Sequence, residues 1–193
     1  NRMHTWARYE LVLELLNRGL EKFGNISYTQ PPMEEIPELY KHRFPMIVDT
    51  ANPPRDAYQI NSDLITACLF NVVTETSCDF TNVFPGSEEA IITEKTVKPL
   101  LARQMFIMAS QTGSVQFLRD IGIDMFDDVI DHSYDNIQGF VPKTYAIHAE
   151  LQRLSKLDLE TIFKQNRSRL EANHDRLFDT EFKDLAAKQL ITG

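Results

Sequence analysis

The segment Ile91–Pro99, which reads IITEKTVKP, gathers residues that could bind an anionic ligand. It places Thr93, Glu94, Lys95 and Lys98 around the expected beginning of a helix. A helix N-terminus offers free backbone N–H groups and the positive end of the helix dipole, which together suit a phosphate. Lys95 adds a full positive charge there, and Lys98 adds a second. The segment therefore predicts a phosphate-binding helix start, although a capped surface helix with solvated lysines has the same pattern.

The position of Pro99 bears on where this helix begins. Proline fits best within the first turns of a helix, because it has no backbone N–H to donate. We therefore expect the helix to run from about Thr93 or Thr96 to Arg103, and Pro99 favours the start near Thr96. This would leave Thr93–Lys95 in a turn that faces the ligand.

Two apolar runs, one before and one after this helix, have the pattern of buried parallel strands. The first covers Ala67–Glu75 and ends in polar residues, and the second covers Met105–Ala109. A further helix is expected over Ser114–Ile121, closed by Gly122. Strand, helix, strand and helix at these spacings predict a βαβα unit with neighbouring parallel strands. Ligands bind at the carboxyl ends of such strands, where the Thr93–Lys95 turn is expected.

The remaining segments have helical or irregular patterns. A first helix is expected from Thr5 to about Leu20, with Gly24 as its left-handed end and a short strand at Asn25–Tyr28. Beyond Pro142, apolar residues recur at helical spacing in three successive stripes. We therefore predict an α/β domain over residues 1–140 and a helical C-terminal extension over residues 141–193.

Charge and hydropathy exclude several classes of partner. The formal net charge is -8, which opposes binding to the phosphate backbone of nucleic acid as a bulk partner. No apolar run approaches the roughly 20 residues that a transmembrane helix needs. The start of the chain lacks a signal-peptide pattern, and Cys68 and Cys78 are too few for a disulfide scaffold. We therefore expect a cytoplasmic location and no membrane span. The sequence leaves open whether the chain forms a homo-oligomer.

A metal site is not expected. Five aspartates form an acidic run, but their spacing is not that of an EF-hand loop, and a solvated face with helix caps explains them better. The five histidines have no metal-ligand spacing. The acidic run consists of Asp124, Asp127, Asp128, Asp131 and Asp135.

Three longer segments are more specific than the single motif. They are VVTET at Val72–Thr76, IITEKTVKPLLARQMFIM at Ile91–Met108 and GSVQFLRDIGIDMFDDVIDHSYD at Gly113–Asp135. Together they resemble a family of glycosyltransferases common in viruses and bacteria. The Thr-Glu-Lys core is similar to the donor-site motif of the α1,3-fucosyltransferases, which have two Rossmann-like domains. The beginning of the chain, with Asn1-Arg2 before a helix and then Ile26–Tyr28, also looks like this family.

The resemblance implies a Rossmann-like parallel sheet with flanking helices over residues 1–140. It also implies roles for site residues. Lys95 would neutralise the diphosphate of the donor, and Glu94 would accept hydrogen bonds from the ribose hydroxyls. Glu75 matches a strand-end glutamate that lines the same cleft, and Thr93 would support the turn. Lys98 joins them as a further donor-site candidate.

The expected reaction is transfer of a sugar from a nucleoside-diphosphate sugar to a glycan or other acceptor, with no further cofactor. Positive groups would stabilise the leaving diphosphate in an oxocarbenium-like transition state. The loop at residues 78–90 is longer than in the fucosyltransferases, and no residue is assigned as catalytic base. We expect the chain to be part of a longer protein and not to be active alone. The alternative is a non-catalytic α/β interaction module that keeps the fold without the chemistry.

Overall fold

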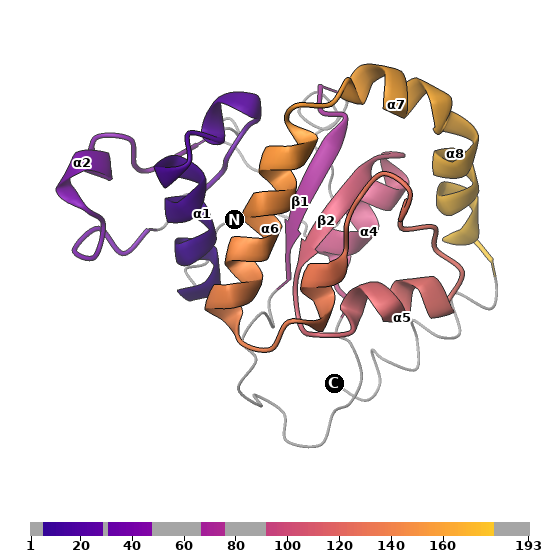
Figure 1. The fold of residues 1–193 in the computed structure, drawn as a ribbon, viewed down its shortest axis with the longest axis horizontal. Helices are drawn as coiled ribbons and strands as arrows, with labels where there is room; N and C mark the ends of the chain where they lie inside the picture. The colour runs from indigo at the N-terminus through magenta and orange to yellow at the C-terminus, as the bar shows by residue number, and fades with distance from the viewer. Residues whose placement is uncertain (1–5, 29–30, 48–66, 76–91, 180–193) are drawn as a thin grey trace. The chain divides into compact units, whose positions relative to one another are not determined.

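The computed structural model describes residues 6–28, 31–47, 67–75 and 92–179. The chain divides into two compact units, Asn1–Asn61 and Ser62–Gly193 (Figure 1). Residues on both sides of the expected 140/141 boundary therefore share one unit. The segment 78–90, on which the comparison with the fucosyltransferase loop rests, lies outside the described residues.

The first unit contains helix α1 (Trp6–Asn17), the 3-10 helix η1 (Glu21–Phe23) and the single turn of α2 (Glu38–Lys41). The segment that was expected to be a short strand pairs through a single antiparallel bridge between Tyr28 and Met46. Its backbone hydrogen bonds measure 2.8 and 3.1 Å. The core of this unit is a cluster of buried side chains: Tyr9, Val12, Leu16, Tyr28, Ile36 and Phe44.

The end of α1 differs from the prediction. Gly24 was expected to supply the left-handed stop, but its φ of -168° is ordinary extended backbone. Gly19 is the left-handed residue, with a φ of 63°, and it lies two residues beyond the end of α1. The prediction was wrong because the 3-10 helix η1 separates Gly24 from the end of α1.

The second unit is built on a parallel pair of strands, β1 (Phe70–Thr74) and β2 (Met105–Ala109). Phe70 lies opposite Met105, and Thr74 lies opposite Ala109. This confirms the prediction that the two apolar runs form neighbouring parallel strands. The described residues show a mixed α/β arrangement with a two-stranded parallel sheet, and a larger Rossmann-like sheet stays a prediction.

Helices cover both faces of this sheet. Helix α4 (Glu94–Leu101) connects the strands and packs on both of them, whereas α6 (Phe140–Leu154) packs on β2. Figure 1 shows α6 in front of the sheet and α4 behind it. All five residues of β2 are buried, as expected for a strand between two helical layers.

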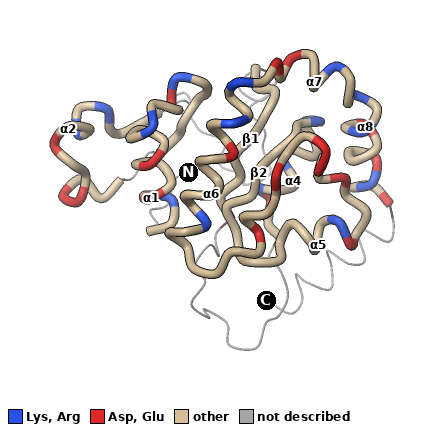
Figure 2. Tube along the Cα trace, in the orientation of Figure 1, with Lys and Arg blue, Asp and Glu red and all other residues tan. Residues whose placement is uncertain are grey.

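The other elements of the second unit follow β2 in the chain. They are α5 (Ser114–Asp120), the 3-10 helix η2 (Ser133–Asn136), α7 (Leu159–Gln165) and α8 (Arg167–Arg176). Gly122 has a φ of 85° and closes the region of α5, as the sequence predicted. Along α7 and α8 basic and acidic residues are interspersed (Figure 2). Within the four described ranges, no helix is long and apolar enough to cross a membrane.

Candidate functional site

The predicted donor site lies where β1 ends and α4 begins. Helix α4 starts at Glu94 with Thr93 as its N-cap, so of the two expected starts the one at about Thr93 is confirmed and the favoured one near Thr96 was wrong. The hydroxyl oxygen of Thr93 accepts a hydrogen bond from the backbone N–H of Lys95 at 3.3 Å. This N-terminal cap adds a first turn, and Pro99 consequently lies inside the helix.

The reason for this earlier start is the carboxylate of Glu75. Glu75 follows β1 directly and is completely buried. One carboxylate oxygen accepts hydrogen bonds from the backbone N–H of Thr93 at 3.1 Å and from the Thr96 hydroxyl at 2.6 Å. The other oxygen accepts a bond from the Thr93 hydroxyl. A negative charge at a helix N-terminus is stabilised by the helix dipole, so Glu75 anchors α4 to the end of β1.

Lys95 and Glu94 form an ion pair on the first turn of α4. The Lys95 ammonium nitrogen lies 3.0 Å from a Glu94 carboxylate oxygen and 3.1 Å from the Thr93 hydroxyl oxygen. Both side chains are 25% exposed, so a ligand in solution can reach the pair. Burial raises the pKa of Glu94, but the hydrogen bond and the charge of Lys95 lower it, and the net pKa is below the ordinary 4.5.

The structure thus brings four of the five predicted site residues together. Thr93, Glu94 and Lys95 surround the helix start, with Glu75 beneath them, and Lys98 lies one turn further along α4. The Glu75 carboxylate already accepts a hydrogen bond from the backbone N–H of Thr93. A phosphate at this position would therefore depend on the Lys95 ammonium more than on the helix dipole. No described side chain in this group is assigned as a catalytic base.

A second polar group lies at the end of β2, and it contains Asp135 of the acidic run together with Lys143, which the sequence analysis did not single out. Lys143 on α6 is buried, and its ammonium group contacts the turn that follows β2. Asp135 of η2 caps the start of α5 through the backbone N–H groups of Val115 and Gln116. The sequence signal for Lys143 is its position four residues before Ile147, in the apolar stripe of α6. A lysine in an apolar stripe indicates a buried partner.

The aspartates of the acidic run make ion pairs and hydrogen bonds within the fold. Asp124 and Asp128 pair with Arg169, and Asp127 pairs with Arg119. Asp131 accepts the backbone N–H of Ser133 at 2.8 Å. Among the residues that the structure describes, no group of three or more His, Cys, Asp or Glu side chains is placed to hold a metal ion. Three of the five aspartates, Asp124, Asp131 and Asp135, thus accept backbone N–H bonds, and Asp135 does so at the start of α5, as in a helix cap.

The Asp124–Arg169 pair leads to a prediction on acid stability. Hydrogen bonds from Arg169 hold the pKa of Asp124 below its ordinary 3.8, against the effect of burial. A lowered pKa means that the stabilisation is complete above about pH 4 and is lost as the pH falls through the folded-state value. We expect Asp124→Asn to be less stable than wild type at pH 7, and the difference to shrink towards pH 2. Urea unfolding at both pH values measures this, and a constant difference would contradict it.

His132 belongs to a buried hydrogen-bond chain. Its Nδ1 lies 2.8 Å from the Tyr134 hydroxyl, and its Nε2 lies 2.8 Å from the carbonyl oxygen of Met125. The Tyr134 hydroxyl accepts the backbone N–H of Met108 at 3.2 Å, so Tyr134 donates its own proton to His132. Burial lowers the pKa of His132, which favours the neutral ring with its proton on Nε2. This chain of hydrogen bonds joins β2 to η2.

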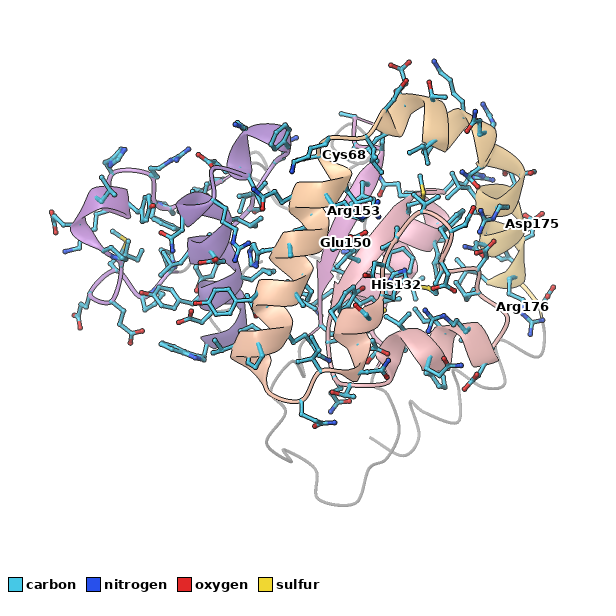
Figure 3. All side chains as sticks on the ribbon, viewed as in Figure 1. Cys68, His132, Glu150, Arg153, Asp175 and Arg176 are labelled. Carbon is cyan, nitrogen blue, oxygen red and sulfur yellow. The ribbon has the colours of Figure 1, made fainter. Side chains whose placement is uncertain are left out.

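A shallow polar depression of about 440 Å³ lies over the η2 region. Its basic residues already have partners: Arg119 pairs with Asp127, and Arg153 pairs with Glu150. Figure 3 labels His132, which directly precedes η2, and Glu150 and Arg153, which lie on α6. The depression therefore offers no uncompensated positive charge for an anion. It is lined by Arg119, Asp127, Asp128, Val129, Ile130, Asp131, His132, Ser133, Asn136 and Arg153.

Comparison with family models, with curated proteins and with solved structures finds no match to this chain.

Proposed function

We propose that the second unit binds a nucleoside-diphosphate sugar, as the donor half of a glycosyltransferase. The observation that supports this most is the position of Lys95. Its ammonium group is partly exposed on the first turn of a helix that follows the carboxyl end of a parallel strand. Nucleotides bind at this edge of open α/β sheets. The Thr-Glu-Lys sequence there is the part that resembles the donor motif of the fucosyltransferases.

The proposed roles follow from the chemistry of the first turn of α4. Lys95 neutralises the diphosphate, and Lys98, one turn further along, adds positive charge. Glu94 keeps a charged carboxylate near neutral pH, because its pKa is lowered, and accepts hydrogen bonds from the ribose hydroxyls. During transfer, the positive groups stabilise the charge that develops on the leaving diphosphate. Glu75 acts through the helix start and does not contact the donor, since it is completely buried.

The alternative is a non-catalytic interaction module. It is favoured by the contacts that already engage the helix start: Glu75 binds the N–H of Thr93, and Lys95 pairs with Glu94. In this case α4 would be a capped structural helix, and the unit would bind no nucleotide. Binding separates the two proposals better than activity does, because the acceptor is unknown.

Replacing Lys95 with alanine is expected to weaken nucleoside-diphosphate binding by about tenfold. A charge-assisted bond to phosphate is worth about 1.5–3 kcal/mol. Part of this binding free energy is offset, because Lys95 must give up its contact with Glu94 to bind the phosphate. Calorimetric titration of the full chain with UDP and with GDP measures the effect.

Lys164→Ala is the matched control for this experiment. Lys164 also pairs with a glutamate on a helix, Glu160 at 2.6 Å on α7, but it lies outside the proposed site. The control is expected to bind like wild type. Wild type that binds no nucleoside diphosphate would favour the interaction module. Equal affinities for wild type and Lys95→Ala would show that this lysine is not the phosphate anchor.

A further inference from the structure

The turn Ser110–Gly113 is a second segment at the carboxyl end of the sheet. It begins directly after Ala109, whose carbonyl oxygen accepts a hydrogen bond from the backbone N–H of Glu75 at 3.1 Å. The carboxylate of the same Glu75 holds Thr93 at the start of α4. The turn and the first turn of α4 are therefore attached to adjacent positions on one edge of the sheet, where ligands bind in such folds.

A buried lysine holds the beginning of this turn. Lys143 is only 1% exposed. Its ammonium nitrogen lies 3.2 Å from the carbonyl oxygen of Ser110, 3.3 Å from the Thr112 hydroxyl and 3.4 Å from the carbonyl oxygen of Asp135. Each of these oxygens can accept a hydrogen bond from the ammonium group. Burying a lysine is costly, and an apolar side chain of similar size would fill the same space, so its hydrogen bonds to the turn are what distinguish Lys143 from an apolar residue.

The end of the turn is held separately. Asp135 accepts the backbone N–H groups of Val115 at 3.2 Å and Gln116 at 3.4 Å, which fixes the start of α5. Gly113 has a φ of 85°, a conformation that other residues rarely adopt. Ser110 is buried, whereas residues 111–113 are partly exposed. The result is a fixed polar turn with an accessible surface.

We propose that Gln111–Gly113 forms the wall of the donor site that contacts the sugar, and that Lys143 is the positioning residue for this wall. The inference rests on the proposed function. The partly exposed residues 111–113 present polar side-chain and backbone groups, which can form hydrogen bonds with sugar hydroxyls. The Thr112 hydroxyl is held inside the turn, because it donates to the carbonyl oxygen of Ile137 at 3.3 Å and accepts from Lys143. The diphosphate is taken by Lys95 on the first turn of α4. Lys143 acts through the turn and does not contact the donor, because it is buried.

This division of contacts has a testable consequence. Lys143→Met is expected to weaken binding of a nucleotide sugar by about tenfold and to change binding of the bare nucleoside diphosphate less than about twofold. Lys95→Ala is expected to weaken both. The probes are UDP with UDP-glucose and GDP with GDP-fucose, titrated into the full chain, and the pair that wild type binds is used. Lys143→Arg, which keeps the charge, is expected to restore part of the affinity for the nucleotide sugar.

The outcomes separate this inference from the proposed function. If Lys143→Met leaves both affinities unchanged, or weakens both equally, the inference is overturned while the donor site itself stands. Wild type that binds neither probe overturns both proposals. If Lys143→Met fails to unfold cooperatively, Thr112→Val decides, because it keeps Lys143 and removes the hydroxyl that joins Lys143 and the Ile137 carbonyl to the turn. Thr112→Val is expected to weaken only the binding of the nucleotide sugar, by about threefold. If it causes no selective loss of affinity for the nucleotide sugar, the inference is overturned.

Discussion

Replacing Glu75 with alanine is expected to lower the free energy of unfolding by about 3 kcal/mol. The carboxylate accepts the backbone N–H of Thr93 and the hydroxyls of Thr93 and Thr96. Thr96 and Glu75 are both completely buried, so water cannot replace the lost acceptor at Thr96. The first turn of α4 also loses the negative charge that stabilises its N-terminus. Urea unfolding of the full chain, followed by circular dichroism, measures the change.

Two variants show whether the carboxylate causes this loss. Glu75→Gln keeps an oxygen that can accept the bonds from Thr93 and Thr96, so it is expected to cost only about 1 kcal/mol. Glu160→Ala removes an exposed glutamate on α7 and is expected to change stability by less than about 0.5 kcal/mol. A Glu75→Ala protein as stable as the Glu160→Ala control would mean that Glu75 does not anchor α4.

Glu75 also shows where local sequence rules stop. The sequence allowed a helix start at about Thr93 or Thr96, and the position of Pro99 favoured Thr96, but α4 begins at Glu94. The glutamate that caps it lies 18 residues before Thr93 in the sequence. A rule based on neighbouring residues cannot include such a partner, and the energy of the buried carboxylate contacts exceeds the preference of proline for the first turn.

The parts that were predicted correctly depend on local patterns. The apolar run Met105–Ala109 forms β2 with these same bounds, and its parallel pairing with β1 follows from the intervening helix. Gly122 closes the α5 region because only a residue without Cβ adopts its left-handed conformation easily. The cluster of Thr93, Glu94 and Lys95 was also predictable, since three consecutive residues at a helix start cannot separate.

The parts that were missed involve contacts between distant residues. Lys143 lies 33 residues after Ser110 along the chain, and its ammonium group was not expected to be buried. Met108 and Tyr134 are 26 residues apart. In each case a polar side chain satisfies the backbone of a segment that the sequence places far away. A hydropathy pattern assigns such a lysine or tyrosine to the surface. The burial of polar groups therefore cannot be predicted from composition.

Replacing Tyr134 with phenylalanine is expected to lower the free energy of unfolding by about 2–3 kcal/mol. The ring keeps its packing, so the loss comes from the hydroxyl alone. Without it, the backbone N–H of Met108 on β2 and the Nδ1 of His132 both lose a partner. Met108 is completely buried and His132 is nearly so, which keeps water from replacing the hydroxyl. Each buried polar group left without a partner costs about 1–3 kcal/mol.

The same hydrogen-bond chain gives the experiment its control and its pH dependence. Tyr145→Phe removes a hydroxyl from an exposed tyrosine on α6 and is expected to cost less than about 0.5 kcal/mol. Because burial lowers the pKa of His132 below the ordinary 6.5, the unfolded chain binds more protons and wild type loses stability as the pH falls below that value. Urea unfolding at pH 7 compares the two variants, and wild type is also measured at pH 5.5. A Tyr134→Phe protein with the stability of Tyr145→Phe would show that the hydroxyl does not hold β2 to η2. The hydrogen-bond chain through His132 would then have no structural role.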